Sequence, residues 1–153
     1  MRLGDIANAD ALGAGKPLDG IRVLALEQMQ ALPYATQLLA RLGADVVKIE
    51  SPRGGDMGRS SLPAMTDPDG RQVGATFLRN NLSKRSICVD IKSDDGRELV
   101  LELAPRFDVV AENFKAGGLS RLGLGYDDVA AVHPAVIYLS VSGFGNTTDS
   151  PYK

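Results

Sequence analysis

The chain has 153 residues, of which 44% are hydrophobic and 24% charged, and its formal net charge is −2. This length suits one domain with a substantial core, and the composition is that of a globular protein rather than a disordered or membrane-spanning one. The 17 basic residues are scattered along the chain, so nucleic acid is not an expected partner. The unbroken apolar stretches are only a few residues long, so a membrane is not expected either.

The first 16 residues are rich in glycine, alanine and aspartate without a periodic pattern, and we expect a tail there. They lack the apolar core of a signal peptide, and the single cysteine, Cys88, cannot form an intramolecular disulfide. These features predict a cytoplasmic protein. Cys88 alternates with aliphatic residues in a strand-like run, which favours a buried, inert thiol over a reactive one.

Two aliphatic runs, 21–27 and 44–50, predict strands that are covered on both faces. Between them the segment 35–42 has aliphatic residues at helical spacing, with Pro33 near its start and Gly43 just past its end. A strand, a helix and a strand in such close succession imply a right-handed parallel crossover.

Residues 51–75 contain many glycines and prolines and predict a long irregular segment, which in compact domains is usually a functional loop or disordered. The turn at Ser83, Lys84 and Arg85 is compatible either with a solvated turn or with an anion contact. Ser93 is placed to cap a helix that runs to about Ala104.

The remainder of the chain continues to alternate strands and helices. This order predicts an α/β fold in which a Rossmann-like parallel sheet has helices on both faces. The further strands are expected at 86–92, 107–113 and 135–142, and short helices at 117–122 and 126–132.

Several common functions of such a fold lack their motifs. The first strand-to-helix turn, from Gln28 to Pro33, has no glycine, which argues against a nicotinamide dehydrogenase, and no phosphate-binding Gly-x-x-x-x-Gly-Lys loop occurs. One histidine and one cysteine do not supply a metal site. His133 is interpreted as a polar residue that ends a helix rather than as a catalytic base.

A set of short motifs, in order and without large gaps, resembles family III CoA-transferases, which include formyl-CoA transferase and carnitine CoA-transferase, with α-methylacyl-CoA racemase as a relative. The resemblance implies that residues 17–153 form the N-terminal, CoA-binding portion of that family's large domain. The motifs are Pro17–Leu24, Pro33–Thr36, Leu42–Glu50, Gly55-Asp56, Asn81–Ser86, Asp90–Lys92, Val110–Phe114, Arg121–Tyr126 and Ser142–Gly145.

The resemblance also implies a mechanism, in which an aspartate attacks the thioester carbonyl to give a mixed anhydride and free CoA thiolate before the incoming acid takes over the acyl group. We expect that aspartate beyond Lys153, so no catalytic residue is assigned in this chain, and the chain alone is expected to be inactive. An acyl-CoA racemase or epimerase of the same family, or a non-catalytic CoA-binding fragment, are the alternatives. The aspartates that do not match the nucleophile are Asp90, Asp108, Asp127 and Asp128.

By position, the resemblance places Gln30 and Ala31 at the thioester end, where Gln30 could hydrogen-bond the reacting carbonyl. Some relatives carry an arginine against the adenine where this chain has Ser51, and Arg53 or Arg59 could replace it. The implied partners are an acyl-CoA and a carboxylic acid, with no tightly bound cofactor, in an interlinked homodimer. The implied CoA-binding residues are Met29, Val89, Lys92, Asn113, Phe114 and Arg121, of which Lys92 and Arg121 would meet phosphates.

Overall fold

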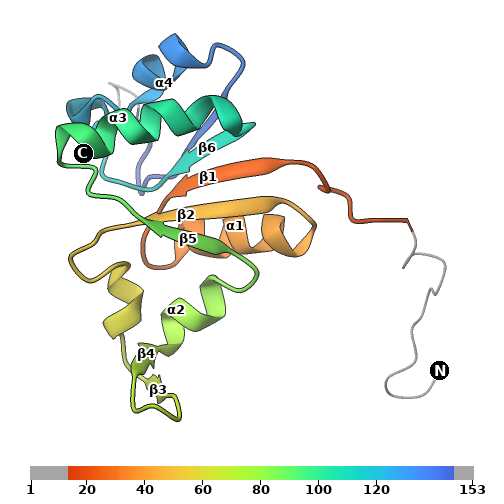
Figure 1. Ribbon diagram of the computed structural model, residues 1–153, viewed down its shortest axis with the longest axis vertical. Coiled ribbons are helices and arrows are strands. Elements are labelled where there is room, and N and C mark those ends of the chain that lie inside the picture. Colours follow the sequence, from red (N-terminus) through yellow and green to blue (C-terminus); the bar gives the residue numbers. More distant parts are fainter. Residues whose placement is uncertain (1–13, 147–153) are drawn as a thin grey trace.

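A computed structural model describes residues 14–146, so most of the expected tail lies outside the described residues. Its centre is a five-stranded sheet in the order β5-β2-β1-β6-β7, in which every neighbouring pair is parallel (Figure 1). This confirms the predicted α/β fold with a parallel sheet. The strands are β1 (Arg22–Leu26), β2 (Asp45–Glu50), β5 (Arg85–Cys88), β6 (Val109–Glu112) and β7 (Ile137–Ser140).

Helices cover both faces of the sheet, as predicted. Alternate residues of β1 separate the two cores: Leu24 and Leu26 pack in a cluster with residues of α3 and α4, whereas Val23 and Ala25 pack in a cluster with residues of α1. Figure 1 shows α1 on one side of the sheet and α3 and α4 on the other. The four helices are α1 (Ala31–Arg41), α2 (Ala75–Asn80), α3 (Asp94–Leu103) and α4 (Tyr126–Val132).

Helix α1 starts earlier than the predicted segment 35–42 and buries a different stripe. Leu38 and Leu42, which the periodic pattern assigned to the core, are 39% and 46% exposed, whereas Thr36 and Gln37 are buried. Both polar side chains have partners, because the Thr36 hydroxyl donates to Glu27 at 2.6 Å and the Gln37 amide oxygen accepts from Leu82 N at 2.8 Å. Specific hydrogen bonds, rather than hydrophobicity alone, therefore set the rotation of this helix.

Helix α3 begins as predicted, with the Ser93 hydroxyl accepting from the backbone N–H of Gly96 at 3.1 Å. The helical conformation does not end at Pro105, since a 3₁₀ turn (η3, Ala104–Arg106) follows α3 directly and includes this proline. The short helix predicted at 117–122 is likewise only a 3₁₀ turn (η4, Ser120–Leu122). His133 follows α4 and its Nε2 lies 3.0 Å from the carbonyl oxygen of Phe107, which agrees with its interpretation as a helix-ending residue.

The segment 51–75 is more ordered than the sequence predicted. It contains a 3₁₀ helix (η2, Met57–Ser60) and an antiparallel pair of strands, β3 (Ala64–Thr66) and β4 (Gln72–Gly74), which with α2 form a lobe below the sheet in Figure 1. Arg59 attaches this lobe to the end of β2, because its guanidinium pairs with Glu50 and lies 3.7 Å over the ring of Phe77.

Strand β5 lies at one edge of the sheet, and this position corrects the expectation for Cys88. The thiol was expected to be buried, but Cys88 is exposed, because no further strand or helix covers β5 on that side within residues 14–146. Strand β7 forms the opposite edge, and Ile137 there is 64% exposed.

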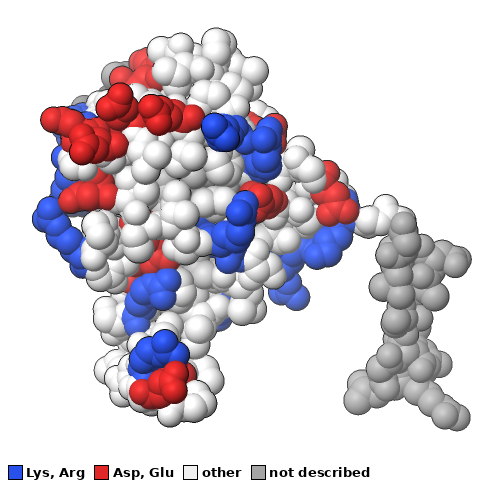
Figure 2. Space-filling model, in the orientation of Figure 1, with Lys and Arg blue, Asp and Glu red and all other residues white. Residues whose placement is uncertain are grey.

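Charged side chains on the face shown in Figure 2 form several small groups of each sign. Many of the red atoms lie over α3, whose outer surface carries four exposed carboxylates: Asp94, Asp95, Glu98 and Glu102. Two of these carboxylates lie in the first turn of α3, where they interact favourably with the positive end of the helix dipole. Among the described helices, none is long and apolar enough to cross a membrane.

Candidate functional site

The order of the strands identifies where a ligand would bind. From β1 the chain proceeds to β2 on one side of the sheet, and it later returns to β6 on the other side of β1. In open parallel sheets, ligands bind outside the carboxyl ends of the strands at such a point of reversal. The turn after β1, residues 28–30, lies at this point, and the family resemblance places the thioester end at the same turn.

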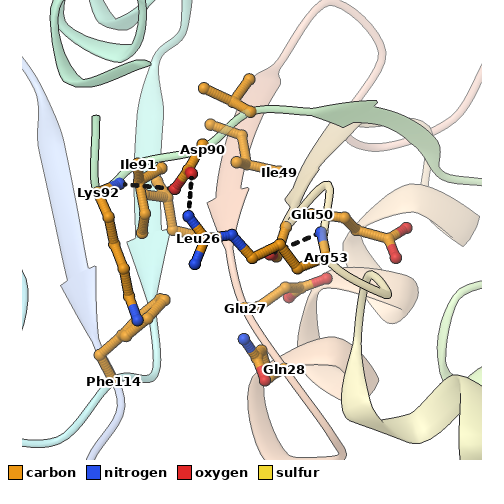
Figure 3. A pocket seen from close by; sticks show the side chains of 12 residues that line it. Leu26, Glu27, Gln28, Ile49, Glu50, Arg53, Asp90, Ile91, Lys92 and Phe114 are labelled. Atoms are coloured by element: carbon orange, nitrogen blue, oxygen red, sulfur yellow. Dashed lines mark hydrogen bonds and ion pairs between the residues drawn. The ribbon is translucent and has the colours of Figure 1, made fainter. Parts of the chain in front are cut away.

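A pocket of about 230 Å³ opens at the carboxyl ends of β1 and β2. Three residues predicted to bind CoA, namely Val89, Lys92 and Phe114, converge on it from the segments that follow β5 and β6. Figure 3 shows the side chain of Lys92 extending toward Phe114. The structure therefore brings together residues that are up to 25 positions apart in the sequence, counted from Val89 to Phe114.

The charges at the mouth of this pocket suit an anionic ligand. Arg53 Nη2 lies 3.0 Å from Asp90 Oδ2, so the carboxylate of Asp90 is already paired, as Figure 3 shows. The ammonium of Lys92 forms no ion pair with any residue in the range 14–146. Because Arg53 neutralises Asp90 and no carboxylate within the described residues neutralises Lys92, the ammonium of Lys92 is able to attract a phosphate at the mouth of the pocket.

The turn that follows β1 is fixed by two side chains from elsewhere in the fold. Asn113 accepts from Gln28 N at 2.9 Å and donates to Gln28 O at 2.9 Å, so both polar atoms of its side chain contact the turn backbone. Met29 has a φ of 67°, which is unusual for a residue other than glycine, and its N–H donates to Asp56 Oδ1 at 3.0 Å. Asn113 thus positions the turn, in addition to lining a second cavity beside Phe114.

Beneath the turn lies a buried charge cluster, formed by Glu27, Lys48, Asp56 and Lys84. Lys48 Nζ is 2.7 Å from Asp56 Oδ2 and 3.4 Å from Glu27 Oε1, and its side chain is 1% exposed. The contact with Asp56 Oδ2 is an ion pair without hydrogen-bond geometry, since that oxygen has no hydrogen-bond partner among the described residues. The sequence analysis missed this cluster, although a lysine within the aliphatic strand β2 is a signal that a buried partner carboxylate exists.

Lys84 completes the cluster from the turn before β5. Its Nζ donates to Glu27 Oε1 at 2.6 Å, to Pro33 O at 2.8 Å and to Asn81 Oδ1 at 3.0 Å, and its side chain is 2% exposed. Burial lowers the pKa of the Lys84 ammonium from 10.5 to about 8, against the opposing attraction of Glu27. The interpretation of this turn as solvated is therefore wrong for Lys84, whose ammonium is buried among protein acceptors.

Glu50, at the end of β2, organises the adjoining lobe. Burial alone would raise the pKa of the Glu50 carboxyl, but hydrogen bonds from Arg59, Ser86 and the backbone N–H of Asp56 lower it from 4.5 to about 2. Arg59 donates to both oxygens of Glu50, at 2.6 and 2.7 Å. Of the two arginines that could replace the adenine-contacting one, Arg53 lines the pocket and Arg59 does not.

The lowered pKa of Glu50 predicts a pH dependence of folding. A carboxyl whose pKa is lower in the folded state stabilises the fold fully above its unfolded pKa, here 4.5, and loses that contribution as pH falls through about 2. We expect the free energy of unfolding to decrease by about 3 kcal/mol from this group between those limits. Denaturant unfolding at a series of pH values would measure it.

The matched comparison for this experiment is a pair of glutamate-to-glutamine variants. Glu50→Gln should flatten the pH dependence between pH 4.5 and 2, whereas Glu102→Gln, at an exposed position of α3, should leave its slope unchanged. Equal slopes in the parent and in Glu50→Gln would contradict the assignment.

The remaining predicted site residues lie in three places. Gln30 and Ala31 line a third cavity at the start of α1, and Ala31 also borders the second. Met29 is 37% exposed at the turn itself. Arg121 lies in η4, close to Gly117, and is not among the residues that line these three cavities. Within residues 14–146 no group of three or more potential metal ligands occurs.

The comparison with protein families agrees with this geometry. The family model of CoA-transferase family III matches residues 18–153. The chain belongs to CoA-transferase family III. This match covers nearly all of the described domain, including every residue of the pocket and of the buried charge cluster.

Individual members of CoA-transferase family III are similar to the chain over most of its length. It is 47% identical over 129 residues to succinyl-CoA:mesaconate CoA-transferase from Haloarcula hispanica, and 44% identical over 138 residues to succinate–glutarate CoA-transferase from Agrobacterium fabrum. These matches cover 84% and 89% of this chain but 32% and 34% of those proteins. The chain thus spans about a third of the length of these relatives.

A solved structure shows the same fold. The crystal structure of a CAIB/BAIF family protein from Brucella suis superposes with a TM-score of 0.80 at 45% sequence identity. The superposition covers 87% of this chain and 35% of that protein.

Proposed function

We propose that the chain is the CoA-binding part of an enzyme that transfers CoA between an acyl-CoA and a carboxylic acid. The observation that supports this most directly is the convergence of Val89, Lys92 and Phe114 on one pocket at the reversal point of the sheet. The family to which the chain belongs supplies the class of reaction. Because the chain spans about a third of its relatives, the complete activity is part of the proposal.

In the proposed complex, the phosphates of CoA lie at the mouth of the pocket beside Lys92. A charge-assisted hydrogen bond from an ammonium to phosphate is about twice as strong as a neutral one. Phe114 and Val89 supply apolar surface for the less polar parts of the ligand, and Arg53 lies at the mouth beside them. Both polar and apolar residues line the pocket, which suits an amphipathic molecule such as CoA.

The thioester lies at Gln30 and Ala31 in this proposal, at the start of α1. The amide of Gln30 donates a hydrogen bond to the thioester carbonyl, where negative charge develops when a nucleophile attacks. Such stabilisation requires a donor whose position is fixed in advance. The hydrogen bonds of Asn113 and Asp56 to the preceding turn provide that support.

The nucleophile of the proposed reaction is an aspartate in the part of the relatives' length that this chain does not match. Its carboxylate attacks the thioester carbonyl carbon, the carbon–sulfur bond breaks, and CoA leaves as the thiolate while a mixed anhydride forms. Two carboxylates near the turn have other roles: Asp56 is buried and paired with Lys48, and Asp90 is paired with Arg53. Asp108 pairs with Arg22 at the opposite end of the sheet.

Titration calorimetry with CoA tests the binding proposal. Replacing Lys92 by alanine should weaken CoA binding by about tenfold to a hundredfold, because one charged hydrogen bond to phosphate is lost. Added salt should weaken the binding of the parent protein as well, since the contact is near the surface. Lys16→Ala, at an exposed position away from the pocket, is the control and should leave the affinity unchanged.

The same titration examines the second predicted phosphate ligand. Arg121→Ala should weaken binding only if the phosphates extend from the pocket to η4, so its effect locates the far end of CoA. If Lys92→Ala binds CoA as tightly as the parent, the placement of the phosphates is wrong.

A further inference from the structure

Three cavities form a row across the turn after β1. The first is the pocket at Lys92, and it shares Phe114 with the second. The second shares Ala31 with the third, which lies between the start of α1 and the end of α2. If a CoA thioester binds as proposed above, with its phosphates at Lys92 and its sulfur at Ala31, the third cavity adjoins its acyl group.

The third cavity has a volume of about 490 Å³ and is lined by donors suited to an anion. The lining residues whose side chains carry such donors are Arg79, Gln30 and Tyr34. No carboxylate lines the cavity, and Arg79 forms no ion pair with any residue of the described chain. A guanidinium that has no carboxylate partner and faces a cavity offers two parallel N–H donors to a carboxylate.

The position of Arg79 relative to the turn is fixed by its neighbours at the end of α2. Asn80 is 2% exposed, and its Nδ2 lies 3.5 Å from the carbonyl oxygen of Met29 in the turn. Leu82 N donates to the side chain of Gln37 in α1 at 2.8 Å. These contacts attach the end of α2 to both the turn and α1, so Arg79 is carried on a supported backbone rather than on a free loop.

On the basis of the function proposed above, we infer that Arg79 determines substrate specificity by binding a second carboxylate, at the far end of the acyl group. The substrates are then dicarboxylic acids and their CoA monoesters: one carboxyl group reacts at Gln30 and the other pairs with Arg79. An acyl group without the second carboxylate leaves Arg79 without its partner and binds less tightly.

The experiment compares ligands that differ only in the far carboxylate. Calorimetric titrations would use dicarboxylic acyl-CoAs of three to six carbons, each against the monocarboxylic acyl-CoA of the same length, with CoA alone as reference. For at least one length the parent protein should bind the dicarboxylic form about tenfold to a hundredfold more tightly, as expected for one charge-assisted contact. In Arg79→Leu this preference should disappear while the affinity for CoA alone is retained.

Two further variants complete the design. Arg79→Lys should retain part of the preference, because it keeps the charge and loses the paired donors. Arg71→Leu removes an exposed arginine from the lobe, where it pairs with Asp67 and Asp69, and should change nothing.

The outcomes separate the two proposals. If CoA binds but no length shows a preference, or if the preference persists in Arg79→Leu, the assignment of Arg79 is wrong and the proposed function stands. Failure of the parent to bind CoA at all would overturn both.

Discussion

Replacing Lys48 by methionine is expected to destabilise the fold by about 3–5 kcal/mol, because one partner of a buried set of charges is removed and the others are left uncompensated. The buried charge cluster contains two carboxylates and two ammonium groups, and Lys48 contacts both carboxylates. Methionine has a similar length and fills the space, so the loss is electrostatic rather than a cavity effect. Urea unfolding would measure the change, which is a large share of the 5–15 kcal/mol typical of a domain.

The matched control for Lys48→Met is Arg71→Met, which also removes one cation from ion pairs. Its side chain is 73% exposed, so water compensates the partners and the expected cost is about 0–1 kcal/mol. A double variant, Lys48→Met with Asp56→Asn, should recover part of the loss, since it removes one charge of each sign and keeps an oxygen that accepts from Met29 N and Gly58 N. Equal destabilisation by Lys48→Met and Arg71→Met would show that the cluster is not a set of interacting charges.

Gly96→Ala is expected to cost about 1–3 kcal/mol and to weaken CoA binding, because the added methyl group has no space. A Cβ atom at Gly96 would lie 2.0 Å from the carbonyl oxygen of Asp90 and 2.9 Å from the capping hydroxyl of Ser93. Relief of this overlap requires movement of the segment that carries Asp90 and Lys92 into the pocket. Thermal unfolding and CoA titration of the same variant would measure the two effects.

Gly143→Ala is the appropriate stability control for Gly96→Ala. No atom lies within 4 Å of a Cβ atom built there, and Gly143 does not have a positive φ. Its melting temperature should therefore remain that of the parent or rise slightly. A Gly96→Ala variant that melts like Gly143→Ala would refute the close approach between α3 and the Asp90 turn.

The general architecture could be predicted because local signals agreed with one another. The aliphatic run in β1 is buried on both faces, Ser93 caps α3, and Gly43, with a φ of 113°, ends α1 in a conformation that favours glycine. Each signal depends on a few neighbouring residues, and each was confirmed. Together they were sufficient to predict five parallel strands with helices on both faces.

The ends of the strands were less predictable, because hydrogen bonds from distant residues decide them. The run 86–92 was predicted as one strand, but β5 ends at Cys88, since the Asp90 carboxylate accepts from Lys92 N at 3.1 Å and turns the chain. This difference affects function, because it is the turn and not a strand that carries Lys92 into the pocket.

For the site, the resemblance singled out some of the residues that line the pocket but not what supports them. Val89 and Phe114, which it assigned to CoA binding, line one pocket, whereas the positioning roles of Asn113 and Asp56 follow only from contacts across 85 and 27 sequence positions. A lone aspartate after a glycine, such as Asp56, carries no local sign that it is buried. Long-range hydrogen bonds of this kind cannot be derived from periodicity or composition.

The buried charge cluster also has a consequence for how this sequence can diverge. Its two acids and two bases come from four separate segments of the chain, Glu27, Lys48, Asp56 and Lys84. A mutation that removes any one of these charges leaves another charge buried without its partner. Such a mutation is therefore expected to persist in evolution only when a second substitution removes or adds the compensating charge. We therefore expect these four positions to covary among homologues so that their summed charge stays zero. One acid and one base should be lost together, and the loss of a single charge should occur only in homologues whose fold is more stable.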